Sequence, residues 1–167
     1  MNAGLLVGRA VLGLLMAGHG AQKLFGWFGG YGLAGVAGFL ESLGFRPGRL
    51  FALAAGTAEF AGGLLLAAGL LGPVGPALIV AVMIVAAISV HLGHGVFGKN
   101  GMELPLLYGT TAAALTLTGP GRYSLDALAG LDAIWSPEVA WIALALGVLG
   151  GIVNLSLRRT APQPVTA

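Results

Sequence analysis

Long apolar runs, separated by short polar or glycine-containing breaks, dominate the chain. A helix that crosses a membrane needs about 20 mostly apolar residues. Five runs approach this length, at about 4–24, 50–71, 74–92, 102–118 and 138–157. Gly72-Pro73 separates the second run from the third, and Pro105 falls in the first turn of the fourth, where proline is tolerated. The pattern therefore predicts an all-α integral membrane protein with five transmembrane helices.

Three other segments do not fit this length. Residues 31–43 place Leu33, Val36 and Leu40 on one helical face, which predicts a short helix lying at the membrane interface after the first span. Residues 119–137 mix turn residues, aromatic rings and charges, as is typical of a loop at headgroup level. We expect residues 158–167 to form a disordered tail. Arg9 lies inside the first run and no small-residue cleavage site interrupts it, so we expect that run to be a retained span.

Composition supports the membrane assignment. The chain is 57% hydrophobic and only 8% charged, against about 25% charged residues in a soluble domain. The net charge of +2, without a basic patch, argues against nucleic acid as a partner. Cysteine is absent, which excludes disulfides, thiolate nucleophiles and Fe–S ligation by this chain. A redox role would therefore need a bound cofactor or a partner protein.

Glycine supplies 30 of the 167 residues. Small residues spaced four apart, as at Gly4/Gly8 and Gly147/Gly151, let two membrane helices approach closely, and Gly62-Gly63 lies within the second run. These positions predict a tightly packed bundle.

Basic residues predict the orientation. Five spans place the loops at 25–49 and 93–101 on the same side as the C-terminus. That side carries most of the positive charge: Lys23, Arg46, Arg49, Lys99, Arg158 and Arg159. The excess predicts a cytoplasmic C-terminus and an N-terminus outside.

Polar residues from four runs fall in the same half of the membrane. They are His19, Lys23, Glu59, His91 and Glu103. Glu59 is the most informative, because a carboxylate inside a span costs roughly 2.5–3.5 kcal/mol on insertion scales and should face the interior, find a partner or hold its proton. His19 and Lys23 share a helical face and are the nearest partners by depth. Two interpretations stay open: a packing carboxylate bonded to a neighbouring helix, or one wall of a polar pocket that handles protons or a ligand.

The sequence gives weaker support for haem or metal binding. Haem ligation by His19 and His91 or zinc binding by His91, His94 and Glu103 is conceivable, but histidines near the interface need no ligand, so we predict no metal site. Arg9 either snorkels or pairs with acidic residues of the 119–137 loop, and Arg122 serves to anchor that loop. Both are interpreted as structural, and no catalytic residue is predicted.

Four blocks of the sequence together resemble the DoxX family of bacterial membrane proteins. They are "GRAVLGLLMAGHGAQKLFGWFGG", "AGTAEFAGGLLLAAGLLGP", "VHLGHGVFGKNGMELPLLYG" and "LTGPGRYSLDALAG", in that order from Gly8 to Gly130. The resemblance implies a four-helix bundle of the cytoplasmic membrane, over residues 1–132, and an association with oxidoreductase complexes. Arg9, His19, Lys23, Glu59, His91 and Glu103 match polar positions of the family pattern. The helix predicted within 133–157 is additional to that pattern.

Three hypotheses for function follow. The first is a quinone-linked or redox-accessory subunit with a polar pocket in the bundle, in which quinone is the favoured cofactor and haem is disfavoured. Its partners would be the bilayer, a redox enzyme or other membrane subunits, or a second copy of the chain. The second is a bundle that binds or transports a small molecule or protons, and the third is a non-catalytic scaffold of a membrane complex. We expect the chain to be an accessory subunit of an oxidoreductase and not an enzyme by itself.

Overall fold

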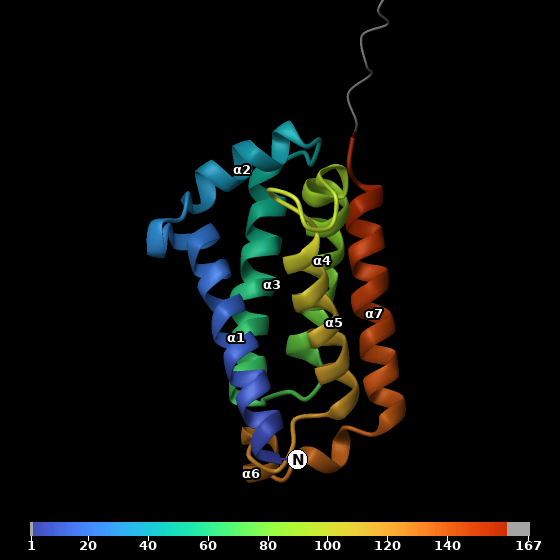
Figure 1. Ribbon diagram of the computed structural model, residues 1–167. Helices are drawn as coiled ribbons and strands as arrows, with labels where there is room; N and C mark the ends of the chain where they lie inside the picture. Colours follow the sequence, from blue (N-terminus) through green and yellow to red (C-terminus); the bar gives the residue numbers. More distant parts are fainter. Residues whose placement is uncertain (1, 160–167) are drawn as a thin grey trace, which may run out of the picture.

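The computed structural model describes residues 2–159, and these residues form helices joined by short connections, with no strand among them (Figure 1). The long helices are α1 (Asn2–Phe25), α3 (Gly48–Ala68), α4 (Val74–Ala86), α5 (Glu103–Thr118) and α7 (Pro137–Ser156). The α4 helix continues through a π-helical turn, η2 (Ala87–His91), and a 3-10 turn, η3 (Leu92–His94). The short elements are η1 (Trp27–Gly29), α2 (Gly32–Ser42), α6 (Leu125–Leu128) and η4 (Asp132–Ile134).

The prediction of an all-α membrane protein is confirmed. Four helices of the described chain are long and apolar enough to cross a membrane: Asn2–Phe25, Gly48–Ala68, Val74–His94 and Pro137–Ser156. The α5 helix has 16 residues, which is short of the about 20 that a span needs. It nevertheless runs alongside α4 within the bundle (Figure 1). A fifth crossing at α5 therefore stays a prediction.

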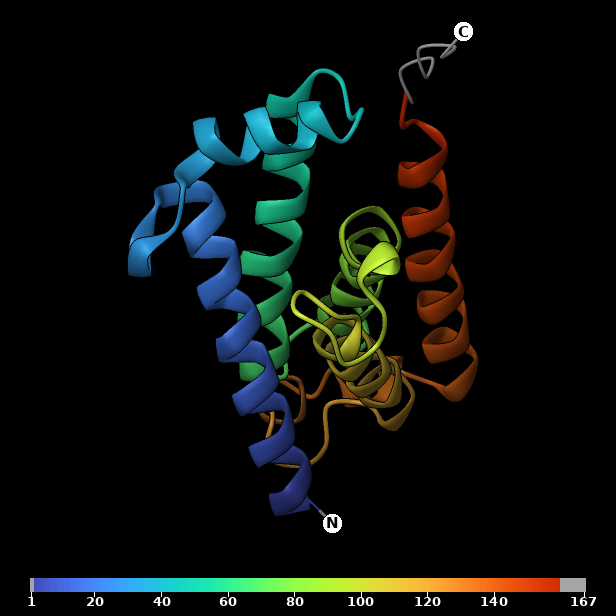
Figure 2. The same ribbon diagram turned by 45° about the horizontal axis from the view of Figure 1, so that its top comes forward.

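The helices form two groups on either side of α4. The α1 and α3 helices pack against each other, α4 packs against both α3 and α7, and α5 packs against α4 (Figures 1 and 2). The N-terminus lies at the end of the bundle that carries α6, whereas α7 ends near α2 at the opposite end (Figure 1). We refer to these as the α6 end and the α2 end.

The interfacial segment predicted at 31–43 is confirmed as a helix, α2, which lies across one end of the bundle (Figure 1). Three hydrogen bonds hold its C-terminal end. Glu41 Oε1 accepts a hydrogen bond from the backbone N–H of Gly48 at 2.9 Å. Arg158 Nε donates to the carbonyl of Leu43 at 2.5 Å, and the Arg159 N–H donates to the carbonyl of Gly44 at 2.9 Å. The first two residues of the predicted tail thus join α7 to α2, and residues 160–167 lie outside the described residues.

Glycines bring the α1 and α3 backbones into direct contact. A Cβ added at Gly13 would lie 2.5 Å from the Gly63 carbonyl oxygen, and one added at Gly63 would lie 2.5 Å from the Gly13 carbonyl oxygen. On α7, a Cβ at Gly147 would lie 2.6 Å from the carbonyl oxygen of Ala77 in α4. The predicted packing roles of Gly63 and Gly147 are therefore confirmed.

The prediction for Gly4 and Gly8 is wrong. A Cβ added at either would meet nothing within 4 Å, because this part of α1 turns these positions away from α3. Spacing alone does not say which face of a helix meets a neighbour.

The contact between α1 and α3 generates a stability prediction. We expect Gly63→Ala to lower the free energy of unfolding by about 1–3 kcal/mol or more, since the new methyl group meets backbone atoms that cannot move away. Gly8→Ala is the matched control and should leave stability unchanged or slightly raised. Thermal unfolding of the purified protein in detergent measures both, and equal midpoints would show that the contact is not tightly packed.

Candidate functional site

A cavity of about 480 Å³ lies in the half of the bundle nearer α2. Its walls come from α2, α3, the α4–η2 segment and α7, with Lys23 reaching in from α1. Most of the lining is aliphatic or aromatic. The polar side chains on its wall are those of Lys23, Ser89, His91 and Asn154. The site is therefore an apolar chamber with a few hydrogen-bonding groups.

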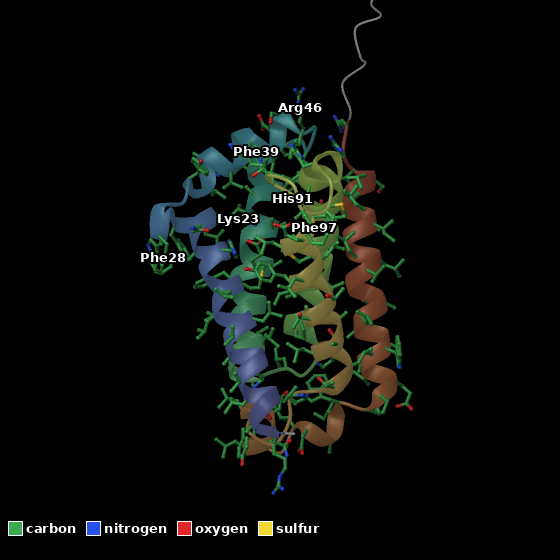
Figure 3. All side chains as sticks on the ribbon, viewed as in Figure 1. Lys23, Phe28, Phe39, Arg46, His91 and Phe97 are labelled. Carbon is green, nitrogen blue, oxygen red and sulfur yellow. The ribbon has the colours of Figure 1, made fainter. Side chains whose placement is uncertain are left out.

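Lys23 and Glu59 form an ion pair between α1 and α3. Lys23 lies in the last turn of α1, at the α2 end of the bundle (Figure 3), and its Nζ contacts Glu59 Oε1. Glu59 is only 1% exposed. Its second oxygen, Oε2, is buried and has no hydrogen-bond partner among residues 2–159. The pair therefore leaves one buried acceptor without a donor.

The end of α4 changes its helical geometry where it reaches the cavity. In the π-helical turn η2, three consecutive residues, Ser89, Val90 and His91, line the cavity. Single π turns within α-helices are frequent at functional sites, because the wider turn redirects side chains. Ser89 donates its hydroxyl to the carbonyl of Val85 at 2.5 Å.

The contact of His91 fixes the chemistry of its ring. His91 Nδ1 lies 2.7 Å from the carbonyl oxygen of Asn100. Because a carbonyl can only accept, Nδ1 carries the proton, and Nε2 of the neutral ring keeps a free lone pair. Nε2 can therefore accept a hydrogen bond from a hydroxyl, or donate one to a carbonyl when the ring is protonated.

The structure brings together some of the predicted pocket residues and separates others. Lys23 pairs with Glu59. Lys23 and His91, which both lie toward the α2 end of the bundle (Figure 3), line the same cavity. His19 is exposed, with its ring centroid 6.0 Å from that of Tyr108, and Glu103 is exposed at the start of α5. Neither lines the cavity. A ligand role for the set stays a prediction, and no metal-binding group of three His, Asp or Glu side chains occurs within residues 2–159.

Sequence reasoning missed Asn154 as a cavity residue. It lies on α7, is half-buried, and its amide makes no hydrogen bond within the described part of the chain. A lone amide in the otherwise apolar run at 138–157 was the available signal, because polar groups within membrane helices usually face the protein interior.

At the α6 end, Arg9 is buried against the 119–137 loop. It donates to the carbonyl oxygen of Pro120 at 2.8 Å and to that of Tyr123. The sequence predicted snorkelling or pairing with acidic side chains of this loop. Arg9 is buried and does not snorkel; its hydrogen bonds go to the loop backbone, and Asp126 of the loop is close enough to interact with its charge. Arg122 is exposed, and its N–H donates to Asn2 Oδ1 at 3.4 Å.

Asp126 is a second buried group that sequence reasoning did not single out. It is fully buried, and its two oxygens accept hydrogen bonds from the backbone N–H groups of Leu71 at 3.0 Å and Gly72 at 2.6 Å. The carboxylate thus ties the 119–137 loop to the turn between α3 and α4. Together, Arg9 and Asp126 fasten the α6 end of the bundle.

A family model described as DoxX matches residues 4–92, slightly more than half of the chain. The chain belongs to the DoxX family. No curated protein and no solved structure gives a significant match. The DoxX match contains Lys23, Glu59 and His91, whereas α5, α7 and Asn154 lie beyond it. The protein is a DoxX-type multi-pass membrane protein whose apolar helices contact lipid.

The Lys23–Glu59 pair generates a second stability prediction. We expect Lys23→Met to cost about 1–3 kcal/mol, because it leaves a buried carboxylate unpaired. This is below the cost for a fully buried pair, since the Lys23 side chain is 30% exposed. The double variant Lys23→Met/Glu59→Gln should lose less than the two single variants added together.

Unfolding of the four proteins in detergent measures this coupling. Lys99→Met, at an exposed lysine on the same side of the bundle, controls for the loss of a positive charge. If the loss of stability in the double variant equals the sum of the losses in the two single variants, the interaction between Lys23 and Glu59 does not stabilise the protein.

Proposed function

We propose that this DoxX protein is a quinone-linked accessory subunit of a membrane oxidoreductase, and that quinone binds in the cavity beneath α2. One observation carries the proposal: a chamber of about 480 Å³ with mainly apolar walls holds a few hydrogen-bonding groups and adjoins a buried ion pair. Ligand sites typically combine such a volume with a small number of placed polar groups. A quinone ring needs apolar walls for its faces and hydrogen-bonding groups for its two oxygens.

The polar groups suit both redox forms of such a ring. The Lys23 ammonium, the Asn154 amide or a protonated His91 can donate to a quinone carbonyl. The neutral His91 ring can accept from a quinol hydroxyl through Nε2. Glu59 is not on the cavity wall, so it would take part in proton transfer to or from the ring only through its partner Lys23.

The electrons would come from a partner, since the chain has no cysteine. Reduction of a quinone to a quinol takes two electrons and two protons. In this proposal the protein binds the ring and supplies groups for proton transfer, and a partner redox enzyme supplies the electrons. A second copy of the chain or another membrane subunit would be an alternative partner.

The distribution of basic residues supports an orientation of the protein in the membrane. The basic residues at the α2 end, Arg46, Arg49, Lys99, Arg158 and Arg159, favour this end as cytoplasmic in a bacterial inner membrane, with the N-terminus outside. The cavity would then lie in the cytoplasmic half of the bilayer. Residues 1–132 would form the DoxX-like unit, and the helix within 133–157 would be an addition to it.

The α6 end weighs against a transporter. Alternating access needs a route from the site to each face in turn. Arg9 and Asp126 bind the loop and the turn that cover that end, and breaking these contacts would expose buried charges. A scaffold needs no ligand cavity, so the quinone-binding experiment distinguishes a scaffold role from the proposed accessory-subunit role.

We expect protein purified in mild detergent to retain quinone in its extracted lipid, and to bind a short-chain quinone analogue by calorimetry. His91→Leu should weaken binding about 3- to 10-fold, as expected for the loss of one hydrogen bond. His94→Leu is the matched control, because His94 is exposed and lies outside the cavity wall. Glu59→Gln should fold and bind but lose quinone reduction with the partner enzyme.

Two outcomes would overturn the proposal. One is wild-type protein without retained quinone and without binding of the analogue. The other is equal binding by the wild type and His91→Leu. A scaffold would show normal complex assembly for Glu59→Gln and no dependence on quinone.

A further inference from the structure

The cavity opens on one side of the bundle. Among the residues that line it, the exposed ones are Phe39 on α2, Ala54 on α3 and Gly150 on α7. Ala54 and Gly150 lie on the two helices that flank α4, and Phe39 lies on α2, which covers the cavity. The open side of the chamber therefore lies between α3 and α7, beneath α2, and we call it the lateral opening.

Small residues keep the lateral opening wide. Gly147 and Gly151 face α4, where an added Cβ would lie 2.6 Å and 3.0 Å from carbonyl oxygens. Gly150 differs, because its added Cβ would meet only the Ala81 methyl carbon at 3.9 Å. The α7 helix thus packs on α4 through Gly147 and Gly151, whereas Gly150 faces unfilled space. Ala54 brings only a methyl group from the α3 side.

Both ends of the bundle are fastened. The α2 helix is held to α3 through Glu41 and Gly48, and to the end of α7 through Arg158 and Arg159. At the opposite end, Arg9 and Asp126 bind backbone groups of the covering loop and turn. A ligand that used either end would have to break these hydrogen bonds, whereas the lateral opening requires none to break.

We infer that the ligand enters the chamber sideways from the bilayer, between α3 and α7 and past Ala54 and Gly150. The class of ligand rests on the proposed function: a membrane-dissolved molecule with a polar ring and an apolar tail. Its ring would reach Ser89 and His91, and its tail would remain in the lateral opening among the lipid chains. Asn154 lies one helical turn beyond Gly150, so its amide is placed to meet a polar ring.

The absence of cysteine allows a direct test of this route. Ala58 lines the cavity, and the Ala58→Cys variant carries a single thiol inside it. In proteoliposomes, the uncharged reagent N-ethylmaleimide should label this thiol, whereas a sulfonated maleimide, which stays in water, should label it far more slowly.

Gly150→Phe, added to Ala58→Cys, should fill the lateral opening and slow labelling by about tenfold or more, since a close-packed ring leaves no path for the reagent. Leu149→Phe is the matched control, because Leu149 is exposed next to Gly150 but does not line the cavity. Ala54→Phe tests the same opening from α3, should Gly150→Phe fail to fold.

The outcomes separate this inference from the proposed function. Unchanged labelling with folded Gly150→Phe or Ala54→Phe would overturn the lateral route, even if the wild type binds quinone. Fast labelling by the sulfonated maleimide would overturn it as well, since the chamber would then open to water. Slowed labelling in a protein that binds no quinone analogue would support the lateral opening and reject the proposed ligand.

Discussion

The close contact of the α1 and α3 backbones is the constraint on which the rest of the structure depends. Membrane helices gain little from burying apolar surface against each other, so close packing must hold them together. Gly13 and Gly63 remove the side chains at the point of contact, and Gly56 on α3 leaves room for the side chains of Lys23 and Leu24 on α1. This contact sets the rotation of α1 about its axis. Lys23 therefore meets Glu59 instead of pointing into lipid, and Glu59 is not left buried without a partner.

The two ends of the bundle use buried polar groups in different ways. At the α6 end, both oxygens of Asp126 and the terminal nitrogens of Arg9 bind backbone groups of turns, which fixes the loop that covers this end. Among residues 2–159, the buried side-chain atoms without a hydrogen-bond partner lie at both ends: Glu59 Oε2 toward the α2 end, and Arg9 Nε and Trp135 Nε1 at the α6 end. Only at the α2 end does such an atom adjoin the cavity, whose wall also carries the half-buried Asn154 amide. Buried polar groups are costly when unpaired. The cavity beside Glu59, and not the unpaired atoms alone, is the physical reason to place binding at the α2 end and structural support at the α6 end.

Much of this arrangement could be predicted from the sequence. Apolar runs located the long helices, and counting about 1.5 Å of rise per residue placed Lys23 and Glu59 in the same half of the membrane. Depth does not give rotation, however. It could not show that Gly8 faces away from α3, or that His19 lies outside the cavity. The sequence "AISVH" also carries no mark of a π turn, so the exposure of three consecutive residues to the cavity could not be predicted. The role of Asp126 could not be predicted either, because it depends on the turn between α3 and α4 lying beside the loop, which is a tertiary contact.

The α7 helix shows how a site can change around a fixed pair of charges. Gly147, Gly150, Gly151 and Asn154 recur at helical spacing and form one stripe. Part of this stripe docks on α4, and Gly150 and Asn154 face the cavity. The DoxX-matched segment supplies Lys23, Glu59 and His91, whereas α7 lies beyond that match. Substitutions along the stripe would therefore alter the width and polarity of the chamber without disturbing the contact between α1 and α3 that holds the ion pair. A helix outside the matched segment is thus in a position to determine which ligand fits.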